Sequence, residues 1–197
     1  MQNNYYTRSG NASKTSYKVH KESYIKSLPV SLSSIALKNS IKVFSYEKYS
    51  EITKLSCAKI AEKYGDDGFV QRLQGKYFIF CREDVPYKKR RWTVAHELGH
   101  IFLGHLEKER HEHEFSEAEA NCFASELLLP TPVLKRCALN SPSDIASECC
   151  VSLSAARIKF DELQSGCGMD GELEKLLILQ FGEYIGGKRN IYAAAEK

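Results

Sequence analysis

The segment that most constrains this chain is His96-Glu97-Leu98-Gly99-His100, in which two histidines stand four residues apart. In an α-helix, residues four apart differ in direction by about 40°, so both imidazoles project from one face and can bind one metal ion. The residues from Trp92 to Leu103 include no proline, and their apolar members form a stripe that faces away from the two histidines. We therefore expect a helix here that carries a metal site on one face.

Glu97 borders this face and is the residue type that such a site uses as a base. A bound metal lowers the pKa of a water molecule and polarises a substrate carbonyl, while a carboxylate accepts the proton from that water. Two imidazole ligands, completed by a carboxylate ligand from elsewhere in the chain, suit Zn²⁺, and Mn²⁺ or Fe²⁺ also accept these ligand types. We predict His96 and His100 as metal ligands and Glu97 as the catalytic residue.

The third protein ligand must come from outside this motif. His105 is nine residues after His96 and lies on the opposite side of the helix, unless Gly104 ends the helix first. Two further histidines fall in the charged stretch 107–114, which is typical of a solvated connection. None of these histidines is favoured by its spacing.

A second helix is expected over 116–129, because a proline follows directly. Glu117 and Asn121 share one face of it, since they are four residues apart. Ser116 and Glu119 have the spacing of a capping box, which would commit Glu119 to backbone N–H groups. We predict Glu117 as the third metal ligand, with Glu119 as the alternative. Asn121 is predicted to hydrogen-bond a ligand imidazole and fix its tautomer.

The remaining patterns indicate an α+β fold with a small sheet in the first half of the chain. We expect helices over 32–38 and 51–64, a strand over 41–46, and a hairpin of 68–75 and 76–81 that turns at Gln74-Gly75. After Pro86 the patterns are helical. The small N-terminal antiparallel or mixed sheet should therefore pack on a mainly helical core.

The two ends of the chain differ from its middle in composition. Residues 1–17 are polar and lack acids, which predicts a flexible N-terminal tail. Residues 18–165 then form one domain, and 166–197 supply a C-terminal helix, Leu173–Phe181, followed by a polar tail from Gly186-Gly187. No signal peptide or transit peptide is indicated at the N-terminus.

Residues 141–163 have the apolar pattern of a helix-turn-helix pair. Asp161 and Glu162 follow Arg157 and Lys159 on the second helix, which leaves little net charge to meet phosphates. The whole chain has 28 Lys and Arg against 25 Asp and Glu, a net charge of only +3. We therefore expect a structural helix pair and no direct DNA binding.

Cysteine usage and hydropathy indicate a cytoplasmic protein. The seven cysteines are odd in number and include no C-x-x-C pair, as expected of reduced thiols. The longest apolar runs fall far short of the roughly 18–20 residues of a membrane-spanning helix. We expect no membrane partner, and the oligomeric state stays open.

Two stretches carry a resemblance to a known family: Arg91–His105, RWTVAHELGHIFLGH, and Glu117–Pro130, EAEANCFASELLLP. In this order and at this distance they resemble the core signature of the ImmA/IrrE family of metallo-endopeptidases. The resemblance extends weakly over about residues 20–165. It implies a zincin-like core of the gluzincin type, in which His96, His100 and Glu117 bind Zn²⁺ and Glu97 is the general base.

The same resemblance implies a biological role that no residue pattern predicts. Members are prokaryotic cytosolic proteases, often encoded on mobile elements or phages, that cut a helix-turn-helix repressor and so derepress its genes. We therefore expect a zinc-dependent endopeptidase that cleaves such a repressor in a mobile-element, phage or stress regulon. The alternative is a metal-binding regulator that sequesters a partner protein without cutting it.

Overall fold

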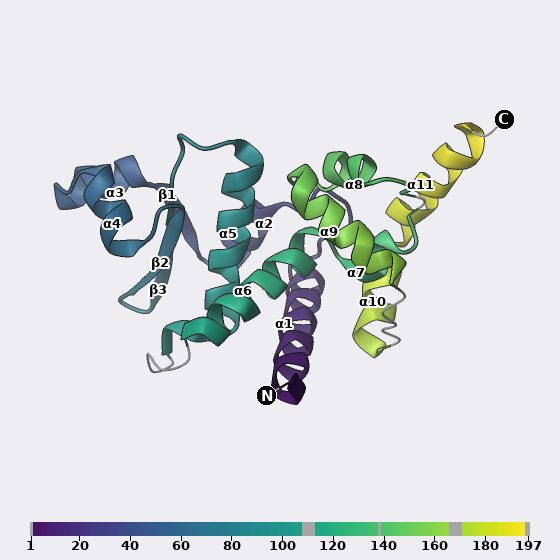
Figure 1. Ribbon diagram of the computed structural model, residues 1–197, viewed down its shortest axis with the longest axis horizontal. Helices are drawn as coiled ribbons and strands as arrows, with labels where there is room; N and C mark the ends of the chain where they lie inside the picture. The colour runs from purple at the N-terminus through teal and green to yellow at the C-terminus, as the bar shows by residue number, and fades with distance from the viewer. Residues whose placement is uncertain (1, 108–112, 138, 166–170, 196–197) are drawn as a thin grey trace.

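The computed structural model describes residues 2–107, 113–137, 139–165 and 171–195, which form a mixed α and β fold dominated by helices (Figure 1). Its strands are β1 (Lys42–Ser45), β2 (Gly68–Leu73) and β3 (Lys76–Cys81). Its helices are α1 (Gln2–Glu22), α2 (Leu32–Lys38), α3 (Tyr46–Thr53), α4 (Cys57–Tyr64), α5 (Tyr87–Phe102), α6 (His113–Leu128), α7 (Thr131–Leu134), α8 (Pro142–Glu148), α9 (Leu153–Gln164), α10 (Glu172–Gln180) and α11 (Gly182–Ala195), with a short 3₁₀ turn η1 at His105–Glu107. The predicted α+β class, a small sheet with a mainly helical remainder, is confirmed.

The three strands form one mixed sheet in the order β1-β3-β2. β1 runs parallel to β3, with Val43 opposite Ile79, and β2 runs antiparallel to β3, with Phe69 opposite Phe80. The predicted hairpin is confirmed, because Gln74 and Gly75 join β2 to β3 with φ angles of 49° and 76°. Positive φ at both turn residues matches the twist of a two-residue hairpin. Because β2 is last in the strand order, it is an edge strand of the sheet within the described residues.

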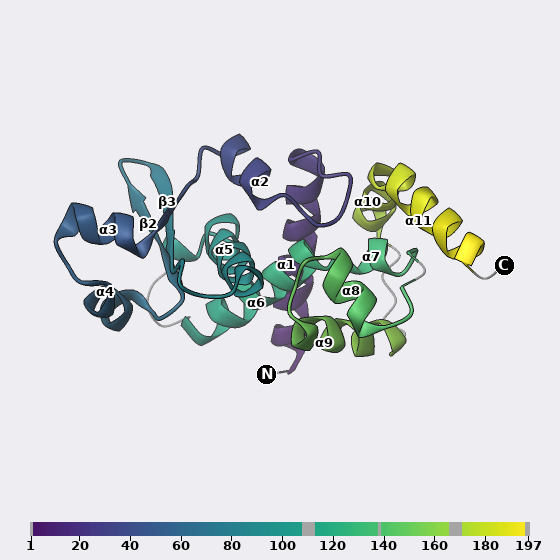
Figure 2. The ribbon, with the colours of Figure 1, turned by 90° about the horizontal axis from the view of Figure 1, so that it is seen from above.

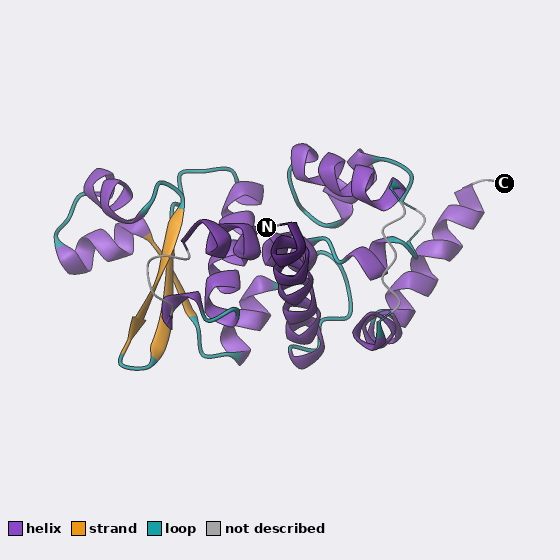
Figure 3. Ribbon diagram, turned by 60° about the horizontal axis from the view of Figure 1, so that its bottom comes forward, coloured by secondary structure: helices purple, strands orange, loops and turns teal. Residues whose placement is uncertain are grey.

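The sheet lies at one end of the molecule, and the C-terminal helices lie at the other (Figures 1 and 3). Helices α3 and α4 pack on the sheet through a small aromatic cluster of Tyr46, Tyr49, Ile60, Phe69 and Phe80. Helix α5 contacts both β2 and β3 and also packs against α6. The view from above shows α1 between the α5 and α6 pair and the C-terminal helices (Figure 2). The helix that carries the histidine motif is thus held between the sheet and the helical half.

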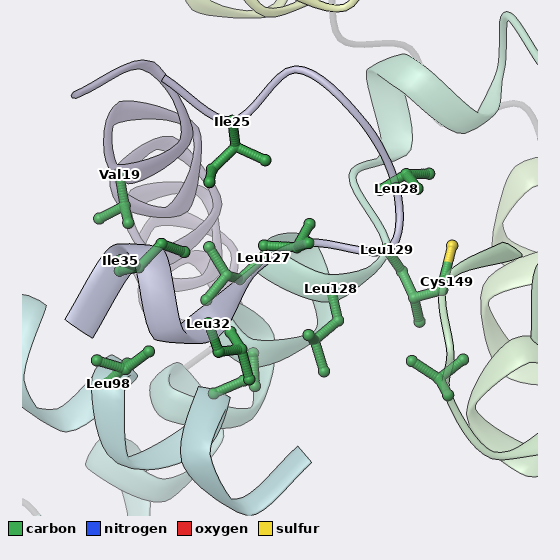
Figure 4. Packing of buried hydrophobic residues seen from close by; sticks show 14 of the residues in the cluster. Val19, Ile25, Leu28, Leu32, Ile35, Leu98, Leu127, Leu128, Leu129 and Cys149 are labelled. Carbon is green, nitrogen blue, oxygen red and sulfur yellow. The ribbon is translucent and has the colours of Figure 1, made fainter. Parts of the chain in front are cut away.

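The main hydrophobic core surrounds the end of α6. Leu127, Leu128 and Leu129 are almost completely buried there. Figure 4 shows them among side chains from α1, α2, α5, the segment between α1 and α2, and the end of α8, namely Val19, Ile25, Leu28, Leu32, Ile35, Leu98 and Cys149. Burial of this many aliphatic side chains fixes α6 relative to α5.

Serine caps begin five of the helices. In each, the serine side chain accepts a hydrogen bond from a backbone N–H three residues later, which satisfies a group that the first turn leaves open. These caps are Ser31, Ser45, Ser56, Ser141 and Ser152, at the starts of α2, α3, α4, α8 and α9.

Residues 51–64 do not form the single helix that their spacing predicts. The structure ends α3 at Thr53 and begins α4 at Cys57. Lys54 adopts a left-handed conformation, with φ of 61°, and its N–H bonds to the Ser50 carbonyl. Ser56 then caps the next helix. The left-handed residue and the serine cap thus divide the segment into two helices despite its continuous apolar spacing, and both helices pack on the sheet.

The N-terminal segment is helical where a flexible tail is predicted. Helix α1 covers residues 2–22, and Ala12, Ser16 and Tyr17 are almost fully buried in it. Tyr17 donates a hydrogen bond of 2.6 Å to the buried Glu126 of α6. The prediction of a tail through residue 17 is wrong because a polar face built from Ser and Tyr packs against α6, which composition alone does not reveal.

The C-terminal region also continues further than predicted. Helix α11 runs through Gly186 and Gly187 to Ala195, where a polar tail is expected. Tyr184 and Lys188 both bond the Glu148 carboxylate at the end of α8, the latter at 2.6 Å. These contacts and the burial of Ile185 hold the helix despite its three glycines. Leu173 lies in α10, which forms the expected helix up to Gln180.

Helices α8 and α9 occupy the segment whose pattern predicts a helix-turn-helix pair. Cys150 lies between them with φ of 54°, a left-handed conformation that permits a tight turn. The two helices contact each other. Their resemblance to a DNA-binding motif stays a prediction.

Six cysteines in the described residues are free thiols, and Cys167 lies outside those residues. Among the described residues, no helix combines the length and the apolar character needed to cross a membrane.

Candidate metal centre

The site is built where α5 and α6 approach each other closely. Gly99 of α5 makes this approach possible, because a Cβ atom there would lie 3.1 Å from both Cα and the carbonyl oxygen of Ala120 on α6. Those atoms belong to the α6 backbone, so a side chain at this position would require the two helices to shift apart by a few tenths of an ångström. Leu98 and Phe123 are fully buried at the same contact. The two helices that carry the predicted ligands are therefore packed at a fixed separation.

The side chains of His96, His100 and Glu117 converge in space. Nε2 of His96 lies 3.1 Å from Oε2 of Glu117, and Nε2 of His100 lies 3.3 Å from Oε1 of the same carboxylate. The two Nε2 atoms are 3.0 Å apart. One potential ligand atom from each residue lies within 4.8 Å of the others, the arrangement of a metal site with two histidines and one glutamate.

The spacing of these atoms fits a divalent metal. Zinc binds histidine nitrogen and carboxylate oxygen at about 2.0–2.2 Å, which in a tetrahedral site places the ligand atoms about 3.3–3.5 Å apart. The two Nε2 atoms are 3.0 Å apart, and they lie 3.1 and 3.3 Å from the two different oxygens of the Glu117 carboxylate, distances at or slightly below this range. Three protein ligands leave a fourth position for water or substrate, as catalytic sites require.

Asn121 contacts the first of the two histidines. Its Oδ1 lies 3.0 Å from Nδ1 of His96, so the imidazole N–H donates to the amide oxygen. A neutral imidazole with its proton on Nδ1 keeps the Nε2 lone pair, and Nε2 faces Glu117. Asn121 thus occupies the place in which the sequence predicts a residue that fixes the tautomer of a ligand.

Glu119 has a different role from the predicted capping box. Helix α6 begins at His113, three residues before Ser116, so Ser116 lies inside the helix. Oε2 of Glu119 accepts a hydrogen bond of 3.0 Å from Nε2 of His105. Glu119 is therefore turned to another histidine and does not belong to the converging group, in the part of the chain that the structure describes.

His105 is the residue of this site that spacing along a helix misplaces. Helix α5 ends at Phe102, and Gly104 adopts a φ of 69° that reverses the chain. His105 then returns toward α5, where its Nδ1 lies 3.1 Å from Nδ1 of His100. The signal that could have located it is Gly104, a usual helix terminator. Of the two histidines in 107–114, His111 lies outside the described residues.

A cavity of about 600 Å³ opens over this group of side chains. Its walls come from α5, α6, the segment before β2, and β2 itself, and they include Glu97, Trp92, Tyr64, Phe69 and Val70. Glu97 is 7% exposed, and burial raises the pKa of its carboxyl group. A base with a raised pKa beside a metal site is suited to take up a proton near neutral pH.

Glu117 and His96 shift each other's pKa values toward the charged forms. The imidazoles of His100 and His96, whose Nε2 atoms contact the carboxylate, hold the pKa of the Glu117 carboxyl group well below its usual range. Burial alone would lower the pKa of His96, but the contact with Glu117, the charges of Glu97 and Glu117 and the contact with Asn121 together raise that pKa. Glu117 is therefore a carboxylate, the form that a metal ligand requires.

The segment that carries these side chains matches a known family. The model of the IrrE N-terminal-like domain, a peptidase family, matches residues 52–161. This segment is more than half of the 197 residues. The chain belongs to this family. No curated protein matches it.

The IrrE N-terminal-like segment contains every side chain of the candidate site. It begins within α3, continues through the hairpin and the pair α5 and α6, and ends within α9. Helices α1, α10 and α11 lie outside the match. Family membership supports a metallopeptidase with a protein substrate, which agrees with the converging His96, His100 and Glu117.

Proposed function

We propose that this protein is a zinc-dependent endopeptidase with the zincin-like site that its sequence resembles. His96, His100 and Glu117 hold the metal, and Glu97 is the catalytic base. The observation that carries this proposal is the convergence of one donor atom from each of the three ligands within 4.8 Å. Glu97 lines the same cavity, and it would have no purpose in a purely structural metal site.

The chemistry divides between the metal and the chain. Held by His96, His100 and Glu117, Zn²⁺ would supply Lewis-acid chemistry to the peptide carbonyl and to the attacking water. Glu97 takes the proton from that water and returns it to the leaving amine, which its buried position and raised pKa favour. Asn121 holds His96 in the tautomer that leaves Nε2 free for binding.

The edge strand β2 supports an extended peptide as substrate. Gly68, Phe69 and Val70 of β2 line the cavity that contains the catalytic side chains. One edge of β2 pairs with β3, and the described sheet leaves its other edge open. An extended peptide can add to such an edge through backbone hydrogen bonds, while side-chain pockets select its sequence. This arrangement would carry the scissile bond past Glu97.

The substrate class follows from the resemblance to the ImmA/IrrE family. We infer that the substrate is a helix-turn-helix transcriptional repressor whose cleavage derepresses genes of a mobile element, phage or stress regulon. We place the protein in the cytoplasm, which agrees with its free thiols. The helix pair α8 and α9 then serves as a structural or substrate-gripping element.

The test is incubation of the purified protein and Zn²⁺ or Mn²⁺ with the helix-turn-helix repressor encoded beside its gene. Mass spectrometry of the products locates any cut. We expect one discrete cleavage that Glu97→Gln slows by about 100-fold or more. Glu62→Gln, which removes an exposed carboxylate on α4, makes the same charge change and should cut normally.

Either result is informative. A cut that disappears with Glu97→Gln, while bound metal is unchanged, identifies metal-dependent proteolysis. No cut by the metal-loaded wild type would contradict the repressor assignment. It would favour the alternative, a regulator that sequesters its partner.

A further inference from the structure

His105 occupies a buried position behind His100. Its side chain is only 2% exposed. Its Nδ1 lies 3.1 Å from Nδ1 of His100, and its Nε2 lies 3.0 Å from Oε2 of Glu119. The His100 and His105 rings meet edge to face, with centroids 5.0 Å apart. Glu119, His105 and His100 thus form a continuous row of side chains from α6 to α5.

When His105 is neutral, the chemistry of these groups fixes the direction of both hydrogen bonds. A carboxylate only accepts, so Nε2–H of His105 donates to Glu119. A neutral imidazole carries one proton, which leaves Nδ1 of His105 as an acceptor. The proton between the two Nδ1 atoms therefore belongs to His100. Nε2 of His100 keeps its lone pair, and this is the atom that faces Glu117.

The backbone holds His105 in this place. Gly104 has a φ of 69°, which a residue with a side chain rarely adopts. Its N–H bonds to the Ile101 carbonyl, and the Glu107 N–H bonds to the Gly104 carbonyl. The chain therefore leaves α5 and enters η1 in a closed turn that aims the imidazole back at α5.

We propose that His105 is a positioning residue for the metal centre and that Glu119 is its anchor. The inference rests on the proposed function, because it concerns the same metal. His105 holds His100 as the Nδ1–H tautomer and orients Nε2 toward the metal, as Asn121 does for His96. Each of the two histidine ligands thus has its own partner, and the partner of His100 is itself fixed by a carboxylate.

The test measures zinc affinity and the His100 tautomer in the full-length protein. Zinc dissociation constants come from competition with a chromophoric chelator. The tautomer comes from heteronuclear NMR of the imidazole nitrogens in the metal-free protein. The variants are His105→Phe, which cannot hydrogen-bond, and His105→Gln, which can accept from His100 and donate to Glu119. Glu119→Gln tests the anchor separately.

We expect His105→Phe to weaken zinc binding by ~10- to 100-fold, the usual effect of losing such a partner. His105→Gln should restore most of the affinity, and Glu119→Gln should give an intermediate loss. In the wild type the His100 proton should sit on Nδ1, and in His105→Phe it should no longer be confined there. If His105→Phe fails to fold, His105→Gln and Glu119→Gln still provide the comparison.

Two results would overturn the inference. One is unchanged zinc affinity in a folded His105→Phe protein. The other is a wild-type His100 whose proton sits on Nε2 in the metal-free state. A wild type that binds no zinc would contradict the proposed function instead, and the tautomer measurement would still decide whether His105 positions His100.

Discussion

Nζ of Lys159 on α9 lies 2.7 Å from Oε1 of Glu126 on α6, and both side chains are buried. The same carboxylate accepts hydrogen bonds from Tyr17 of α1 at 2.6 Å and from Thr131 of α7. Burial alone would raise the pKa of Glu126, but Lys159 and these hydrogen bonds hold it below its usual value. Four helices therefore meet at one ion pair, close to the end of the helix that carries Glu117.

Removing one partner of this pair should destabilise the fold strongly. Lys159→Met leaves the Glu126 charge buried, and we expect a loss of about 3–5 kcal/mol in the free energy of unfolding. Urea denaturation measures this loss. Lys48→Met removes the exposed partner of Glu51 and should change the free energy of unfolding far less, because water screens that pair. The double variant Lys159→Met with Glu126→Gln should recover part of the stability. Equal losses for Lys159→Met and Lys48→Met would contradict this account.

Gly99 and Gly186 should respond oppositely to alanine. Gly186→Ala places a methyl group in open space on α11 and should stabilise the protein by about 0.5–1 kcal/mol. Gly99→Ala brings a methyl group within 3.1 Å of the Ala120 backbone and should destabilise it by about 1–3 kcal/mol. Zinc affinity should also fall, because α5 must move away from Glu117. Thermal unfolding and zinc titration of both variants provide the check, and a stabilised Gly99→Ala protein with normal affinity would refute it.

Asn121→Ala should weaken zinc binding by about tenfold or more, because His96 loses the acceptor for its Nδ1–H. The unfolding free energy of the metal-free protein should change little, since Asn121 is exposed. Asn39→Ala, which removes a hydrogen bond to Ile35 at the end of α2, is the matched control and should leave zinc affinity unchanged. Chelator competition distinguishes the two variants. A similar affinity for both would mean that Asn121 only packs.

His20 should make the stability of the protein depend on pH. It is completely buried, and burial lowers its pKa to about 4, against about 6.5 in an unfolded chain. Between these values the unfolded chain binds the extra proton. Stability from this group is therefore complete above about pH 6.5 and falls by up to about 1.4 kcal/mol per pH unit as the pH drops toward 4.

His20→Gln isolates this contribution. The glutamine amide can still donate to the Leu127 carbonyl, which Nε2 of His20 contacts at 2.9 Å. Urea denaturation at pH 7 and pH 5, with a chelator present, should show a smaller loss on acidification for the variant than for the wild type. The other described histidines are common to both proteins. Equal losses would rule out His20 as a source of the pH dependence.

The local elements of the site could be predicted from the sequence, because each depends on neighbouring residues alone. The spacing of His96 and His100 requires only the geometry of one helix, and that helix is present. The Gln74-Gly75 hairpin likewise depends on backbone preferences at two positions. The capping box that would favour Glu117 over Glu119 does not form, since Ser116 lies inside α6, yet Glu117 is the residue that faces the histidines.

Only the tertiary structure decided which residues meet across the helices. His105 reaches His100 because Gly104 reverses the chain, and no periodicity describes a residue after a helix has ended. Residues 12–17 have the composition of a tail, yet they form a helix that packs on α6, where Tyr17 donates a hydrogen bond to Glu126, more than a hundred positions away. Periodicity and capping reflect interactions within a few residues, whereas burial and polar pairing depend on partners that the fold alone brings together.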